Sequence, residues 1–190
     1  SYVVQEQQLG TGHALLQAEP VLGESFLVVN GDRIIESSVI EDVWDAHQPS
    51  ADPVMAVTRV ETPSRYGVVE LDNRTVQRIT EQPRPELVTS EFINAGVYAF
   101  TPEVFAAIRE LDTHGEQPLT AALSPFIETG RLQAQRYDGL WGDVSEPWDL
   151  LSVHDSLLAY HGPSAYRGTS ARVGLSVGGA GVSAPRLARR

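Results

Sequence analysis

The chain has 190 residues, 42% of them hydrophobic, which is enough for one domain of ordinary size and a short appendage. Its 25 acidic residues outnumber its 14 basic residues, all of them arginine, and the net charge of −11 argues against nucleic-acid binding, because phosphate backbones are held by clustered basic side chains. The absence of cysteine excludes disulfides, thiolate metal sites and cysteine nucleophiles. No long apolar run and no leading basic-then-apolar segment is present, so we expect a cytoplasmic protein without a membrane span or a signal peptide. An alternative setting for such an acidic surface is a high-salt cytoplasm, where the charge is screened.

The first half of the chain alternates strand and helix patterns. Hydrophobic periodicity predicts strands over residues 2–4, 26–30 and 54–60, a helix from Gly12 and a helix over residues 38–47. Two short strands, residues 66–71 and 76–81, flank a polar turn and predict a hairpin. This order indicates βαβ units followed by a hairpin excursion.

The second half continues with an apolar strand over residues 93–100. Thr101 and Pro102 are typical of a helix start and precede a helix over residues 104–111. One helix is predicted over residues 118–129, a strand over 132–137 and a last amphipathic helix over 147–160.

After residue 160 the composition changes abruptly to Gly, Ser, Ala, Val and Arg. We therefore expect a domain over residues 1–159 and a Gly/Ser/Ala-rich tail over residues 160–190. The tail is either truncated or disordered, which we favour because it is too short to stack a stable repeat array, or the start of a left-handed β-helix domain.

Two short motifs predict a nucleotide site with a metal anchor. The run Leu9-Gly10-Thr11-Gly12 opens into an apolar helix, and glycines in such a turn are expected to let the backbone approach a ligand closely. The strand over residues 26–30 is followed by Gly31 and Asp32, which places this carboxylate at the carboxyl edge of a sheet.

Six motifs in order carry a resemblance to a known family. They are Gln5-x-x-Gln8-Leu9-Gly10-Thr11-Gly12-His13-Ala14, Asn30-Gly31-Asp32, Arg65-Tyr66-Gly67-Val68-Val69, Thr80-Glu81-Gln82-Pro83, Ile93-Asn94-Ala95-Gly96-Val97-Tyr98 and Trp141-Gly142-Asp143-Val144. Over residues 1 to about 159 the chain resembles the sugar-1-phosphate nucleotidylyltransferases, in the uridylyl and thymidylyl branch. The resemblance implies an α/β fold with a Rossmann-like mixed, mainly parallel sheet between helices. The implied partners are a pyrimidine nucleoside triphosphate, UTP or dTTP, and a sugar 1-phosphate, which react to give a nucleotide sugar and pyrophosphate.

The resemblance also implies roles for individual residues. Nucleotide-binding residues would be Gln5, Gly10, Thr11 and Asn30, and a side-chain amide suits the imide edge of a pyrimidine. Sugar-binding residues would be Gly67, Glu81 and Asn94. Asp32 and Asp143 would be the catalytic residues and the ligands of Mg²⁺, which prefers oxygen donors.

Several of these residues also have a purely structural interpretation. Asp32 could cap a helix from Ile34 onward, and Asp143 could cap the helix predicted from residue 147. Gly67 and Glu81 also suit a hairpin and its exposed end, and Gln5 suits a solvent-facing strand end. His13, at a helix start, is assigned no catalytic role and is expected to cap or pack.

The sequence departs from the family pattern at two places. Gln82 stands where a lysine commonly follows the glutamate to meet the sugar phosphate, and Arg84 is the residue that would compensate. The family's opening loop, G-x-G-T-R followed by a lysine, has no counterpart before Gln5, and the glycines of residues 178–181 lie in the wrong place. We therefore expect an N-terminally truncated form that is inactive as it stands.

Two alternative functions stay open on the sequence. One is a non-catalytic subunit that binds a nucleotide sugar, and the other is a metal-dependent glycosyltransferase, although Asn30 stands where the Asp-x-Asp motif of those enzymes has its first aspartate. The base, the sugar and the number of subunits, a homo-oligomer included, are left undecided.

Overall fold

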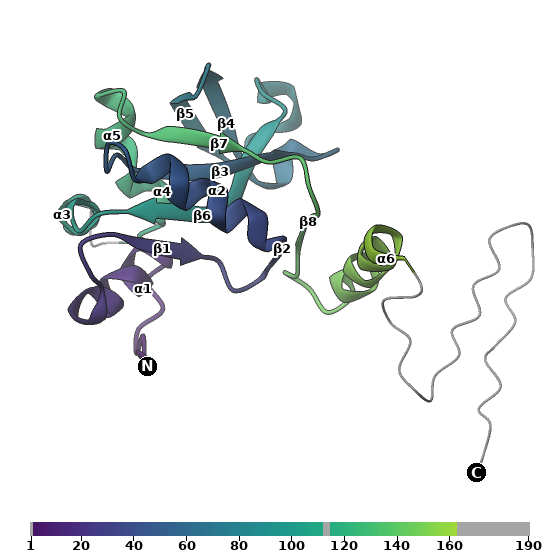
Figure 1. The fold of residues 1–190 in the computed structure, drawn as a ribbon, viewed down its shortest axis with the longest axis horizontal. Helices are drawn as coiled ribbons and strands as arrows, with labels where there is room; N and C mark the ends of the chain where they lie inside the picture. The colour runs from purple at the N-terminus through teal and green to yellow at the C-terminus, as the bar shows by residue number, and fades with distance from the viewer. Residues whose placement is uncertain (1, 112–114, 163–190) are drawn as a thin grey trace, which may run out of the picture. The chain divides into compact units, whose positions relative to one another are not determined.

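The computed structural model describes residues 2–111 and 115–162 (Figure 1). The chain forms two compact units, Ser1–Trp141 and Gly142–Arg190. The predicted tail lies outside the described residues from 163 onward. The domain boundary expected at residue 159 therefore stays a prediction.

The first unit is built on a six-stranded sheet in the order β1-β6-β3-β7-β5-β4, and β6 also pairs with β4. Its strands are β1 Phe26–Val29, β3 Val54–Arg59, β4 Gly67–Asp72, β5 Thr75–Glu81, β6 Phe92–Phe100 and β7 Gln133–Arg136. A further short strand, β2 Arg33–Ile35, follows β1 in the chain. Every strand predicted between residues 26 and 137 is therefore present, with each end within one residue of the prediction.

The sheet is mixed, as expected, but its pairing is less parallel than expected. β1, β3, β4 and β7 run in one direction, whereas β5 and β6 run in the other. Since β6 lies between β1 and β3 and β5 lies between β7 and β4, the pair β3 and β7 is the parallel one within this six-stranded sheet, and its other pairs are antiparallel. The order of strands, which the residue pattern does not encode, accounts for this correction.

Helices cover both faces of this sheet (Figure 1). They are α1 Thr11–Ala18, α2 Ser37–His47, α3 Glu103–Arg109, α4 Leu119–Ala122 and α5 Ser124–Glu128, with single 3₁₀ turns at Glu19–Val21, Pro63–Arg65 and Pro85–Leu87. Val39 and Val43 of α2 pack on one face, and α1, α3, α4 and α5 pack on the other through residues such as Leu15 and Phe105. Burying each aromatic or branched side chain of this kind stabilises the fold by about 2 kcal/mol.

Two predicted elements differ in the structure. Residues 2–4 form no strand; Tyr2 and Val4 are exposed and lie against no neighbouring strand among the described residues. The helix predicted over residues 118–129 is divided at Leu123 into α4 and α5, because Pro125 stands in the first turn of α5 and cannot donate a helical hydrogen bond. Gly130, with φ of 69°, ends α5 as expected.

Strand β6 contains an irregularity that matters for the site. Gly96 has φ of 81°, and the register between β3 and β6 shifts between Met55 and Val57. A side chain at Gly96 would approach Asn30 Nδ2 and Arg33 Cγ to 3.1 Å. Glycine is thus required both by the backbone conformation and by the turn that follows β1.

The second unit contains the helix α6, Asp149–His161, which confirms the last predicted helix. Asp149 closes the turn before it, because its Oδ2 accepts hydrogen bonds from the main-chain N–H groups of Ser145 and Glu146 at 3.0 and 2.8 Å. Gly162, with φ of 72°, follows the last residue. Among the described residues, no helix is long and apolar enough to cross a membrane.

Candidate functional site

The glycine turn before α1 is packed against another part of the chain. A Cβ atom on Gly10 or on Gly12 would lie 2.8 Å from the main-chain oxygen of Gln117, and Gly10 has φ of 99°. Gly12 N donates to Gln117 O at 2.8 Å, and Gln117 N donates to Leu9 O at 2.7 Å. The structure thus gives these glycines a reason other than the expected approach of a ligand: the chain itself approaches closely here.

Thr11 ties this turn to the start of α4. Its Oγ1 accepts a hydrogen bond from Leu119 N at 2.9 Å, across 108 positions of sequence. The hydroxyl of Thr11 is therefore used by the fold. What Thr11 keeps for a ligand is its main-chain N–H, since the first N–H groups of a helix have no acceptor within the helix.

Gln5 lies beside the same turn and is half-buried, rather than solvent-facing at a strand end. Its Nε2 donates to Gly10 O at 3.1 Å and lies 2.9 Å from Nδ1 of His13. The structure therefore brings together the three residues predicted to read the base, Gln5, Gly10 and Thr11. His13 packs and hydrogen-bonds here, as expected for a residue without a catalytic role.

Asn30 is held against the irregularity of β6. Its main-chain N–H donates to Gly96 O at 2.9 Å. Its main-chain oxygen accepts from Arg33 N at 3.2 Å, which closes the turn after β1. Trp141 covers the same turn: its Nε1 donates to Ala95 O at 3.0 Å, and the Arg33 guanidinium lies 5.4 Å from the centre of its ring. The turn that carries Asp32 is thus fixed from several sides.

Asp32 stands at the carboxyl end of β1 with 45% of its side chain exposed, and its Oδ2 lies 3.5 Å from NH1 of Arg33. The alternative that Asp32 caps a helix from Ile34 is wrong, because residues Arg33–Ile35 form the strand β2. An exposed carboxylate at a sheet edge fits the hard oxygen ligands that Mg²⁺ takes. No group of three or more His, Asp or Glu side chains suited to a metal occurs among the described residues, so a cation here would draw its remaining ligands from phosphate and water.

Asp143 lies in the second unit, at the end of the strand β8, Trp141–Asp143. Its Oδ2 accepts a hydrogen bond from the Ser145 hydroxyl at 2.7 Å. Its convergence with Asp32 on one cation stays a prediction.

Gly67 and Glu81 face each other across the hairpin of β4 and β5. A Cβ atom on Gly67 would meet Glu81 Oε1 at 3.0 Å, so the space that glycine leaves is taken by this carboxylate. The hydroxyl of Thr120 donates to Glu81 Oε1 at 2.7 Å. Because Leu119 and Thr120 are neighbours in α4, the start of this helix joins the glycine turn to the hairpin.

Asn94 is bound within β6. Its Nδ2 donates to Tyr98 Oη at 2.6 Å, and its Oδ1 accepts from Gly96 N at 3.1 Å. Burial raises the pKa of Tyr98 to about 12, against the lowering effect of the Asn94 hydrogen bond. The negative charges of Glu81 and Asp32 add to this rise in the pKa, and Arg33 opposes it.

Tyr98 thus contacts one of the residues predicted for the sugar, because its hydroxyl accepts a hydrogen bond from Asn94. Tyr98, Gln117 and Thr120 have no role predicted from the sequence, because nothing in their local pattern shows their long-range partners. For Tyr98, the signal was its place in the same motif as Asn94.

Arg84, the residue expected to compensate for the family's lysine, pairs with a carboxylate two residues away in the chain. Arg84 is 78% exposed in its side chain, and its NH1 lies 3.7 Å from Glu86 Oε1. Gln82 has φ of 41° and donates its N–H to Tyr66 O at 3.1 Å. The role of Arg84 toward a sugar phosphate stays a prediction.

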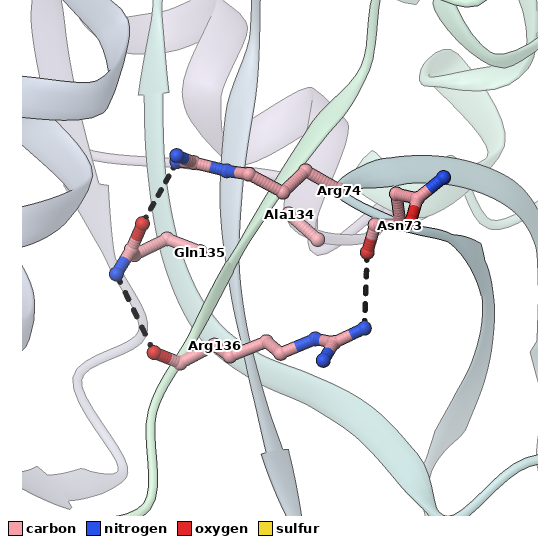
Figure 2. A pocket seen from close by; sticks show the side chains of 5 residues that line it. All are labelled: Asn73, Arg74, Ala134, Gln135 and Arg136. Atoms are coloured by element: carbon pink, nitrogen blue, oxygen red, sulfur yellow. Dashed lines mark hydrogen bonds between the residues drawn. The ribbon is translucent and has the colours of Figure 1, made fainter.

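A hollow of about 360 Å³ has none of the predicted site residues in its lining, and Figure 2 shows the side chains that line it. Its lining consists of Asn73, Arg74, Ala134, Gln135 and Arg136. NH2 of Arg74 donates to Gln135 Oε1 at 3.0 Å, and NH2 of Arg136 donates to Asn73 O at 3.0 Å. Both guanidinium groups already bind oxygens of the lining, and none of the predicted site residues lines the hollow. We therefore do not include it in the candidate site.

Comparison with characterised sequences gives relatives of one kind. Bifunctional protein GlmU of Methanococcus maripaludis strain C5 is 40% identical over 161 residues, which cover 83% of this chain and 38% of that protein. Glucose-1-phosphate thymidylyltransferase of Streptomyces antibioticus is 32% identical over 166 residues, covering 83% of this chain and 46% of that protein. The chain therefore spans less than half the length of these relatives.

Solved structures similar to this chain include nucleotide-sugar pyrophosphorylases. A UDP-glucose pyrophosphorylase complexed with UDP-glucose superimposes with a TM-score of 0.73 at 26% identity, covering 84% of this chain and 66% of that chain. The UDP-glucose pyrophosphorylase of Acinetobacter baumannii gives a TM-score of 0.70 at 25% identity, covering 85% and 60%. The sequence model of the Nucleotidyl transferase family matches residues 1–159, and the chain belongs to this family.

Proposed function

We propose that the protein transfers the nucleotidyl group of UTP or dTTP to a sugar 1-phosphate. An oxygen of the sugar phosphate attacks the α-phosphorus, a new phosphorus–oxygen bond forms, the bond between the α- and β-phosphates breaks, and pyrophosphate leaves. No protein nucleophile is required, so positioning and charge stabilisation supply the rate. The names of the relatives and of the similar structures support this reaction class.

One structural observation supports the proposal most strongly. Residues expected on the base and on the sugar come from distant parts of the chain and are linked through the start of α4, which bonds both Thr11 and Glu81. This arrangement favours two adjacent binding pockets, one for the nucleotide and one for the sugar phosphate. The family match favours nucleotidyl transfer over glycosyl transfer.

The proposed nucleotide pocket is the turn beside Gln5. The amide of Gln5 and the main-chain N–H groups of Gly10 and Thr11 would bind the edge of the pyrimidine. Asn30 lies in the turn that also carries Asp32, so a nucleotide bound there would have its phosphates near the carboxyl end of β1.

The proposed sugar pocket lies by the hairpin. Glu81 is held by Thr120, and Asn94 is held by Tyr98 and Gly96, so both polar groups are oriented before a ligand arrives. Hydroxyl groups of a sugar would be their partners.

Asp32 and Asp143 are the proposed ligands of Mg²⁺. When bound, the cation would neutralise charge on the phosphate oxygens. The chain's own part is to hold Asp32 in a turn that β6 and Trp141 fix in place.

The decisive experiment measures pyrophosphate release with UTP or dTTP and sugar 1-phosphates at varied Mg²⁺. It uses the protein with all sequence that its gene places before and after these residues. Asp32→Asn and Asp143→Asn are each expected to lower kcat about 100-fold or more, because a carboxylate that holds the metal is lost. Asp42→Asn, an exposed aspartate of α2, is the matched control and should leave kcat unchanged.

The binding of the nucleotide without metal separates the outcomes. We expect its Kd to change less than about twofold in Asp32→Asn and Asp143→Asn, since base recognition lies elsewhere. Full activity in both variants would refute the metal assignment. Tight binding of a nucleotide sugar by the wild type without any turnover would instead indicate a non-catalytic subunit.

A further inference from the structure

His13 lies between two glutamine side chains at the start of α1. Its Nδ1 is 2.9 Å from Gln5 Nε2, and its Nε2 is 3.3 Å from Gln17 Nε2. His13 is half-buried and is bonded to the one side chain that we propose reads the base. This arrangement constrains the direction in which the amide of Gln5 faces.

The donors and acceptors around Gln5 favour a single arrangement. Gly10 O can only accept, so the atom of the Gln5 amide that faces it must be the nitrogen. The same nitrogen faces Nδ1 of His13 at 2.9 Å, closer than Gln17 Nε2 lies to the other ring nitrogen at 3.3 Å, so the geometry favours Nδ1 as the acceptor. In neutral imidazole the proton then lies on Nε2.

The oxygen of Gln5 is left for a ligand. Both hydrogens of its amide group are used, by Gly10 O and by His13 Nδ1, and Oε1 has no hydrogen-bond partner among the described residues. Without His13, the amide would be held by a single hydrogen bond and could turn more easily.

A fixed acceptor distinguishes the pyrimidines by their N3 atom. Uracil and thymine carry a hydrogen on N3 and can donate to Gln5 Oε1, whereas N3 of cytosine is an acceptor and would face another acceptor. A mismatch of this kind leaves two acceptors opposed and unpaired, which is costly in a partly desolvated site.

We propose that His13 is a positioning residue that sets the preference for uridine or thymidine nucleotides over cytidine nucleotides, by holding the Gln5 amide with its oxygen toward the base. This inference rests on the proposed function, because it assumes that Gln5 meets the base. His13 itself does not touch the substrate. It deepens that proposal by naming the residue that enforces the base class.

Gln17 offers a way to strengthen the same arrangement. Its Nε2 also donates to the main-chain oxygen of His13 at 3.2 Å, so its amide presents a donor toward a ring nitrogen that carries a proton. A carboxylate at this position would accept from that proton instead. Gln17→Glu therefore favours the form of His13 whose Nδ1 accepts from Gln5.

The test is calorimetric binding of UDP, dTDP and CDP to the wild type, His13→Phe, Gln5→Ala and the double variant. Phenylalanine keeps the ring but removes the acceptor. In His13→Phe we expect the ratio of CDP to UDP dissociation constants to fall about three- to tenfold, as the loss of one hydrogen bond predicts. In Gln5→Ala the further change of His13 should leave the ratio unchanged, because His13 acts only through Gln5.

A purely structural role would weaken UDP and CDP equally and leave their ratio as in the wild type, which would overturn the inference. So would an additive loss of discrimination in the double variant. If His13→Phe does not fold, Gln17→Glu at alkaline pH, where imidazole is neutral, decides the question: a higher preference for UDP supports the inference, and an equal or lower preference contradicts it. A wild type that binds UDP and dTDP no better than CDP, or none of them, would refute the base class in the proposed function itself, and this inference with it.

Discussion

The two edges of the sheet use polar side chains in opposite ways. At one edge, where β1, β3 and β7 begin, Nδ1 of the fully buried His47 donates to Asp52 O at 2.7 Å, and its Nε2 accepts from the Ser25 hydroxyl at 3.2 Å. At the other edge, where β1 ends, Asp32 is 45% exposed. We call these the starting edge and the site edge.

Charges at the starting edge are satisfied by one another. Arg131 donates through NH1 and NH2 to both carboxylate oxygens of Glu103, at 2.7 and 2.9 Å, and its Nε binds Asp52 at 2.9 Å. At the site edge, Asn94 is oriented by Tyr98 and Gly96, while 45% of the Asp32 side chain is exposed. The starting edge thus stabilises the fold, and the site edge holds polar groups ready for a ligand. Substitutions at the two edges should therefore affect stability and binding separately.

The largest effect on stability is expected from His47→Ala. The change leaves a cavity in place of a fully buried ring and takes a hydrogen bond from Asp52 O and from the Ser25 hydroxyl, so it should lower the free energy of unfolding by about 3 kcal/mol. Denaturant unfolding measures this. His13→Ala, at the half-buried histidine, is the matched comparison and should cost less than about 1 kcal/mol. Equal losses in both variants would remove the distinction between the two histidines.

A smaller effect is expected at alkaline pH, from the site edge. Because burial raises the pKa of Tyr98 to about 12, the folded protein keeps a proton that the unfolded chain releases near pH 10. Its contribution is fully present below pH 10, and the free energy of unfolding should fall by up to about 2 to 3 kcal/mol as the pH rises from 10 to 12. Tyr98→Phe should lose this pH dependence in the same titration of unfolding. A Tyr98→Phe profile as steep as the wild type would show that another group is responsible.

The smallest effect is expected from Arg131→Met at the starting edge. The hydrogen bond from Arg131 holds the pKa of Glu103 below its ordinary value of 4.5, so the pair stabilises the fold above that pH and is lost as the pH falls through the lowered pKa. Since 40% of Arg131 and 49% of Glu103 are exposed, solvent screening limits the expected loss to about 1 kcal/mol at pH 7. Unfolding at pH 7 and pH 3 measures it, and the difference between variant and wild type should shrink at the lower pH. A constant difference would assign the loss to packing of the Arg131 stem instead.

Much of the secondary structure could be predicted from local pattern. The apolar run before Asn30 and the alternation around Asn73 are visible in the sequence, and both strands of the hairpin formed within two residues of the prediction. The division of the helix at Leu123 could have been anticipated from Pro125. The pairing of β6 between β1 and β3 could not, because strand order depends on contacts between residues far apart in sequence.

The candidate site shows the same division. Gln5, Gly10 and Thr11 lie within one short segment, and their grouping follows from the sequence motif. The link from Thr11 to Leu119 and from Thr120 to Glu81 joins segments that no local pattern relates. For this reason the sequence identified the polar groups of the site but neither what holds them nor the contribution of Tyr98.

By itself, the sequence determined the types and the approximate ends of the strands and helices, the excess of acidic charge and the family to which the chain belongs, because these depend on composition, short-range periodicity and motif order. Only the tertiary structure decided why Gly10, Gly12 and Gly96 must be glycine and which way the Gln5 amide faces. The physical reason is that steric exclusion and hydrogen-bond donor matching act between atoms a few ångströms apart, whatever their distance along the chain.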